Sequence, residues 1–131
     1  MKVGLDTSVV LRLLLGQPAD QSQRAVAFLE EVARRGDQAI ISDLVVAETY
    51  FALQYHYGVP KKEALVALRR MFNDGEIESQ GVAAEVLAAE GLASAKPGFV
   101  DRLIQSTYVS TGGLMATFEK ASGRLKSVKV L

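Results

Sequence analysis

Residues 3–8 read VGLDTS, a short apolar stretch that ends in three polar side chains. This pattern predicts a buried strand over Val3–Leu5 and a helix over Val9–Leu15. Asp6 lies at the junction between these two elements. A carboxylate at the end of a buried element is costly unless a cation or hydrogen bonds compensate its charge. Asp6 is therefore the first candidate for a functional acid.

Three further acids lie within or directly after apolar runs: Glu48 in LVVAETYF (44–51), Asp101 in FVDRLI (99–104) and Glu119 after LMATF (114–118). Four carboxylates at the ends or edges of buried elements indicate a shared metal ion, because a cation offsets the charge that burial makes costly. Oxygen ligands favour a hard cation such as Mg²⁺, which keeps several of its waters.

Asp6 and Glu48 each allow a structural explanation as well. Asp6 would act as the N-cap of the following helix, but Thr7 or Ser8 could do that equally well. The neighbours of Glu48 are almost all apolar or aromatic, with Thr49 as the exception. A face exposed to solvent would carry more polar residues. A functional role is therefore favoured for both acids.

Asp101 and Glu119 are weaker candidates when each is taken alone. An acid in the first turn of a helix gains from the helix dipole, and Arg102 or Arg124 could pair with Asp101. Glu119 could belong to a solvated turn. Its weight comes from its place after a predicted strand and from the three other acids.

The residues after Glu119 are basic. They include Lys120, Arg124, Lys126 and Lys129, and no acid accompanies them. Such a run usually forms a solvated face, but here it adjoins a candidate acid and could hold phosphates. Lys120 and Arg124 are therefore candidate substrate-binding residues. Thr7 and Thr117 join them, since their hydroxyls could orient carboxylates or contact substrate.

The composition limits the kinds of site that the chain can form. A length of 131 residues, 49% hydrophobic and 23% charged, suits one domain over residues 1–131 with a single core. The formal net charge of zero gives the whole molecule no strong attraction to nucleic acid or membranes. The absence of cysteine excludes disulfides, thiolate zinc sites and cysteine nucleophiles. The apolar run at 9–15 contains Arg12 and is too short for a membrane span, so we expect a soluble, cytoplasmic protein.

Helix and strand signals alternate along the chain. The predicted helices are Val9–Leu15, Ala19–Arg35, Asp43 to about Tyr57 with Ser42 as cap, Lys61–Asn73, Val82–Ala93 and Phe99–Val109. The predicted strands are Val3–Leu5, Gln38–Ile41, Glu76–Ser79, Leu114–Phe118 and Lys126–Val130. Short apolar strands between helices indicate an α/β domain with a mainly parallel sheet covered on both faces. Ligands bind beyond the carboxyl ends of such strands, so this topology allows the four acids to meet there.

Four of these stretches resemble PIN domains, and most closely the VapC-type toxins of bacterial toxin–antitoxin pairs. They are VGLDTSVVLRLL (3–14), ISDLVVAE (41–48), FVDRLI (99–104) and ATFEK (116–120). The similarity spans essentially the whole chain, in the right order. The first two stretches are fairly specific, and the last two become so in combination.

The resemblance implies a PIN-like three-layer α/β/α sandwich with a mainly parallel central sheet. It implies an endoribonuclease that hydrolyses RNA phosphodiester bonds with Mg²⁺, for which Mn²⁺ can substitute. It further implies a cytoplasmic toxin that forms a homodimer and is inhibited by a small antitoxin protein. Carried onto this chain, the catalytic and metal-binding acids are Asp6, Glu48, Asp101 and Glu119.

Two positions depart from the family pattern. The family usually has Asp in the Thr-Phe-acid motif, where this chain has Glu119. Many relatives also carry an acid one helical turn before the counterpart of Asp101, where this chain has Gly98. The number of metals, one or two, therefore stays open. A PIN fold that binds RNA or a partner protein with weak or lost catalysis stays open too.

A receiver-like signalling domain is an alternative from another class. It also places an acid after the first strand and a lysine after a late strand, as Asp6 and Lys120 would be here. Such a domain normally needs two adjacent acids after the first strand and an Asp after the third. This chain has Asp6-Thr7 and Ser79-Gln80 at those places, so the nuclease interpretation is favoured.

Overall fold

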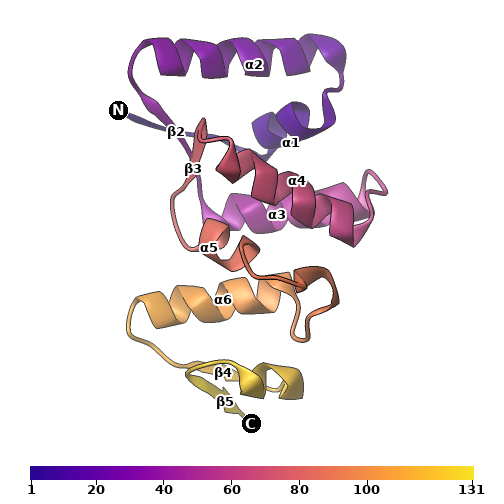
Figure 1. The fold of residues 1–131 in the computed structure, drawn as a ribbon, viewed down its shortest axis with the longest axis vertical. Helices are drawn as coiled ribbons and strands as arrows, with labels where there is room; N and C mark the ends of the chain where they lie inside the picture. Colours follow the sequence, from indigo (N-terminus) through magenta and orange to yellow (C-terminus); the bar gives the residue numbers. More distant parts are fainter. The chain divides into compact units, whose positions relative to one another are not determined.

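The computed structural model describes every residue from Met1 to Leu131. In chain order its elements are β1 (Lys2–Gly4), α1 (Thr7–Leu15), α2 (Ala19–Arg34), β2 (Gln38–Ile41), α3 (Asp43–Tyr55), α4 (Lys61–Asn73), β3 (Ile77–Ser79), α5 (Ala83–Leu87), the 3₁₀ helix η1 (Leu92–Ser94), α6 (Phe99–Ser110), β4 (Met115–Thr117), the 3₁₀ helix η2 (Lys120–Arg124) and β5 (Val128–Val130) (Figure 1). They divide into two compact units, the N-terminal unit Met1–Gln80 and the C-terminal unit Gly81–Leu131.

The N-terminal unit is built on a parallel sheet with strand order β1-β2-β3. Val3 lies opposite Ala39, and Ile40 lies opposite Glu78. The three consecutive residues Ala39, Ile40 and Ile41 of the middle strand are all buried. A parallel strand covered on both faces has this continuous apolar character, whereas a half-exposed strand alternates.

Four helices complete the N-terminal unit. Helix α1 packs against α2 and α3, and α3 packs against α4 (Figure 1). Helix α3 begins at Asp43 because the Ser42 hydroxyl accepts a hydrogen bond from the Val45 N–H at 3.2 Å, which satisfies one free donor of the first turn. Val46 and Leu53 bury this helix in the core.

The C-terminal unit combines α6 with the parallel pair β4 and β5, in which Met115 lies opposite Val128. Helix α6 packs against α5 and β4. Its buried residues include Phe99, and its Gln105 side chain donates a hydrogen bond to the Lys126 carbonyl at 2.7 Å. This bond ties the helix to the segment that leads into β5.

The α/β class with parallel strands is confirmed, and the predicted elements Gln38–Ile41 and Lys61–Asn73 have the bounds that the structure gives. The strands form one three-stranded and one two-stranded sheet, one in each unit. The expected single domain over residues 1–131 stays a prediction. No helix combines the length and the apolar character that a membrane span needs.

The predicted helix Val82–Ala93 is wrong in its length. Helix α5 ends at Leu87, and a separate 3₁₀ turn starts at Leu92. Between them Gly91 has a left-handed backbone with φ 67°, a conformation that interrupts a right-handed helix and suits glycine. The reversal lets Leu92 become buried, at 4% exposure.

Other differences lie at the ends of elements. Helix α3 ends at Tyr55 rather than near Tyr57, and the last strand is confined to Val128–Val130. Ser127 has a φ of 57°, so the extended backbone starts only after it.

Two leucines on α3 give a matched test of this packing. Leu53 is 2% exposed and Leu44 is 79% exposed. We expect Leu53→Ala to lower the free energy of unfolding by about 2–5 kcal/mol, since it leaves a cavity in the core. Leu44→Ala should change it by less than about 0.5 kcal/mol. Chemical denaturation followed by circular dichroism measures both, and equal losses would contradict the placement of the α3 core face.

Candidate functional site

Asp6 is the N-cap of α1 through its backbone. Its backbone is extended (φ −81°, ψ 162°), and its carbonyl accepts hydrogen bonds from the N–H groups of Val9 and Val10 at 3.1 and 3.2 Å. The side chain makes no capping hydrogen bond and no ion pair, and it is exposed. The expectation that Thr7 or Ser8 caps the helix is wrong, since both lie inside α1. The carboxylate of Asp6 is therefore free for another role.

Glu48 lies on an exposed apolar face of α3. Leu44, Phe51 and Tyr55 share this face at helical spacing, and the rings of Phe51 and Tyr55 stack with centroids 6.1 Å apart. Glu48 itself is exposed and has no hydrogen-bond or ion-pair partner. The expectation that its apolar neighbours bury this acid is wrong. Elsewhere on the helix, burial raises the pKa of Tyr50 above its ordinary value.

A buried hydroxyl without a partner follows each of these two acids. Thr7, next to Asp6, is 7% exposed, and Thr49, next to Glu48, is fully buried. The Oγ1 atoms of both threonines have no hydrogen-bond partner. A buried polar group left unpaired costs about 1–3 kcal/mol, and native proteins usually satisfy it with water or an ion. The two helices that carry these pairs, α1 and α3, pack against each other.

In the C-terminal unit, Asp101 is the third residue of α6 and is exposed. It forms no ion pair. Arg102 instead donates from Nε to the Pro97 carbonyl at 2.7 Å, and Arg124 is exposed and has no ion pair either. The pairing that would have explained Asp101 structurally is absent. What remains is the favourable position of an acid in the first helical turn.

Glu119 has a structural role that the other three acids lack. It is the N-cap of η2, where Oε1 accepts a hydrogen bond from the Ala121 N–H at 3.4 Å, a long and weak contact. Its own N–H donates to Oγ1 of Thr117 at 3.0 Å, so Thr117 positions the backbone of Glu119 rather than its carboxylate. Ser122 in the same turn has a buried hydroxyl without a partner.

The basic candidates are accessible. Lys120 and Arg124 lie on η2, are exposed and form no ion pair. The ion pairs between Met1 and Asp37 and between Arg35 and Glu31 include none of the candidate residues. Lys120 and Arg124 are therefore free to contact an anion.

The four acids divide between the units, with Asp6 and Glu48 in the N-terminal unit and Asp101 and Glu119 in the C-terminal unit. Neither unit by itself gathers three or more acidic or histidine side chains. Each unit supplies oxygen donors alone, which fits a hard cation, because Mg²⁺ is commonly held by one or two carboxylates together with waters and phosphates. A joint metal site stays a prediction.

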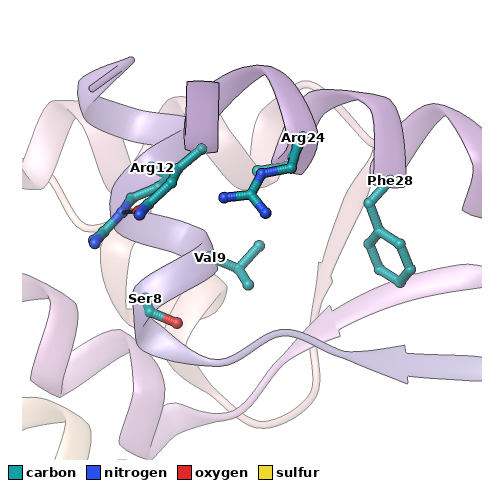
Figure 2. Close-up of a pocket in the computed structure, with 7 residues that line it drawn as sticks. Ser8, Val9, Arg12, Arg24 and Phe28 are labelled. Atoms are coloured by element: carbon teal, nitrogen blue, oxygen red, sulfur yellow. Dashed lines mark hydrogen bonds between the residues drawn. The ribbon is translucent and has the colours of Figure 1, made fainter. Parts of the chain in front are cut away.

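The structure also reveals a cavity between α1 and α2 that the sequence had not indicated. Its volume is about 300 Å³, and it is lined by Ser8, Val9, Arg12, Gln21, Arg24, Ala25 and Phe28 (Figure 2). The one signal in the sequence is the spacing of Arg24 and Phe28, which places a cation and a ring on the same face of one helix.

The PIN domain family model matches residues 3–127, a range that includes all four acids and extends into both units. No curated protein shows significant similarity to the chain. The match agrees with the alternation of helices and parallel strands and with the α/β/α architecture that the resemblance implied. The chain belongs to the PIN domain family.

Proposed function

We propose that this chain is a Mg²⁺-dependent endoribonuclease that hydrolyses phosphodiester bonds in RNA. PIN domains are generally nucleases, and they usually use a divalent metal. The observation that carries the proposal is the state of Asp6 and Glu48. Both carboxylates are exposed and unengaged, and each is followed by a buried hydroxyl that lacks a partner.

The proposal gives the acids different roles. Asp6 and Asp101 hold the metal directly, and Glu48 holds it or orients the attacking water. Their lack of any other partner supports these roles, because a carboxylate already held in an ion pair is a poorer ligand. Glu119 has an outer role or belongs to a second metal. Its contact with Ala121 supports this lesser assignment.

Water attacks phosphorus in line with the leaving 3′ oxygen, and the products carry a 5′-phosphate and a 3′-hydroxyl. Mg²⁺, when bound, makes a coordinated water more acidic and offsets negative charge on the phosphoryl oxygens. Lys120 and Arg124 contact substrate phosphates, which their exposure permits. Thr7, the residue after Asp6, orients that carboxylate through its hydroxyl. Thr117 acts by holding the backbone of Glu119.

A PIN fold that binds RNA or a protein without cleaving it is the second candidate. Its support is Gly98, which offers no carboxylate at the N-cap of α6, together with the partial engagement of Glu119 in a cap. The receiver-like alternative gains nothing from the family match, which is to PIN domains over nearly the whole chain.

The proposal extends to the partners of the chain. It is the cytoplasmic toxin of a toxin–antitoxin pair, held inactive by a small antitoxin protein, and it forms a homodimer. The motif resemblance supports the toxin assignment. The motif resemblance, rather than the exposed α3 face, supports the homodimer too, since the face that carries Phe51 and Tyr55 also carries Glu48 and has to stay open to the metal.

Replacing Asp6 by asparagine tests the nuclease assignment. Asp6→Asn keeps the side-chain shape but removes the charge, so we expect metal-dependent cleavage of single-stranded RNA to fall at least about 100-fold. The melting temperature should stay unchanged, because the side chain has no partner in the fold. The matched control is Asp20→Asn, an exposed acid of α2, which should cleave at the parent rate. Equal rates for Asp6→Asn and the parent protein would refute the assignment.

Metal binding separates the active from the inactive interpretation. We expect the parent protein to bind Mn²⁺ at millimolar concentration or below, as measured by calorimetry. Asp101→Asn should weaken this binding about tenfold or more, since it removes a charged donor. Asp74→Asn, an exposed acid at the end of α4, serves as control. An absence of Mn²⁺ binding at millimolar metal would favour the inactive fold.

Expression in a bacterial host tests the toxin assignment. We expect induction of the parent chain to arrest growth and induction of Asp6→Asn to leave growth normal, because arrest requires RNA cleavage. Co-expression of a small protein from the adjacent upstream reading frame should restore growth. Normal growth with the active, soluble parent chain would contradict the toxin role while leaving the nuclease role intact.

A further inference from the structure

The cavity between α1 and α2 lies wholly within the N-terminal unit. Its lining combines cationic, polar and aromatic side chains, among them Arg24, Ser8 and Phe28. In Figure 2 the Arg24 side chain reaches over Val9, the Ser8 hydroxyl lies on the α1 side, and the Phe28 ring borders the far end. A volume of about 300 Å³ falls at the lower end of the range of ligand-binding cavities. The space suits a small ligand group or one unit of a polymer.

The lining of the cavity includes two arginines and no acid. Arg12 donates from Nε to Oε1 of Gln21 at 2.7 Å, which orients its guanidinium and leaves both terminal nitrogens as donors. Arg24 has no hydrogen-bond or ion-pair partner. Guanidinium groups in this state bind phosphate well, because they present several donors in a planar fork.

Arg12 also lines a second cavity, with a volume of about 610 Å³, together with Leu15, Gln17, Pro18 and Tyr57. The arginine therefore lies between two hollows, and each hollow has an exposed aromatic ring on its border. Phe28 is 42% exposed and Tyr57 is 49% exposed. Aromatic rings alternating with cations along a groove are the usual means by which proteins bind unpaired nucleic acid.

We propose that these two cavities form a binding surface for single-stranded RNA, in which Arg12 and Arg24 hold backbone phosphates while Phe28 and Tyr57 stack on bases. Stacking on a side chain requires a base that is not already stacked inside a helix, so the surface selects unpaired RNA. Ser8, on the border of the first cavity, lies two residues after Asp6 in the chain. The inference rests on the proposed function, since it specifies the form of RNA that reaches that acid.

Fluorescence anisotropy with a labelled single-stranded RNA oligomer tests the surface, in buffer with EDTA so that binding is measured without cleavage. We expect Arg24→Gln to weaken binding about tenfold. The slope of log K against log salt concentration should fall in magnitude by about one, because one phosphate contact is lost. Phe28→Leu keeps an apolar side chain but loses the stacking plane, and it should weaken binding about fivefold or more. The matched control is Arg34→Gln, an exposed arginine near the end of the same helix, which should bind as the parent does.

Three results would overturn the inference. The first is parent-like binding by both Arg24→Gln and Phe28→Leu when both variants melt at the parent temperature. The second is equal affinity for a duplex RNA of the same length. The third is binding of an acidic peptide such as oligo-glutamate that Arg24→Gln abolishes while RNA binding persists, which would make the surface a protein site. Because cleavage is blocked, weaker binding by Arg24→Gln supports the surface even if Asp6→Asn shows that the chain is no nuclease.

Discussion

The parallel pairing of β2 with both of its neighbours is the constraint on which the N-terminal unit depends. The Leu5 N–H donates to the Ile40 carbonyl and the Gln80 N–H donates to the Ile41 carbonyl, each at 2.9 Å, so both outer strands stay bonded to β2 one residue beyond their ends. The chain leaves this edge at Asp6 on one strand and at Ser42 on the next. Asp6 presents a free carboxylate, and Ser42 caps the helix that carries Glu48. The backbone hydrogen bonds of the sheet thus fix the positions of Asp6 and of the first residue of the helix that carries Glu48.

The acids that the sequence singled out are available in different ways. The side chains of Asp6, Glu48 and Asp101 are exposed and have no partner. One carboxylate oxygen of Glu119 accepts a hydrogen bond that caps η2. This difference matters for a nuclease, because a metal competes with every other partner of a ligand. It supports the lesser role proposed for Glu119, at a position where the motif resemblance leads us to expect Asp. The family match covers the range of all four acids.

Local signals sufficed for elements that are both apolar and clearly bounded. Residues 38–41 lie between a glycine-containing turn and the capping Ser42, and residues 61–73 follow Pro60 with a regular apolar face. The segment 82–93 misled the prediction because its alanines favour a helix, while the φ of 67° at Gly91 became visible only in the structure. The exposure of Glu48 was missed for a related reason. Apolar neighbours in sequence do not say which of them the fold covers. The arginine-lined cavity depends on how α1 meets α2, which no single stretch of sequence encodes.

The unpaired hydroxyls of Thr7 and Thr49 have a consequence for the durability of the fold. A buried hydroxyl that finds no partner, water included, costs about 1–3 kcal/mol, a sizeable share of the 5–15 kcal/mol by which a typical domain resists unfolding. Valine has nearly the same volume and would remove that penalty at either position. A gain in thermal stability from valine at either position would therefore come at the cost of altering a residue that adjoins a candidate acid.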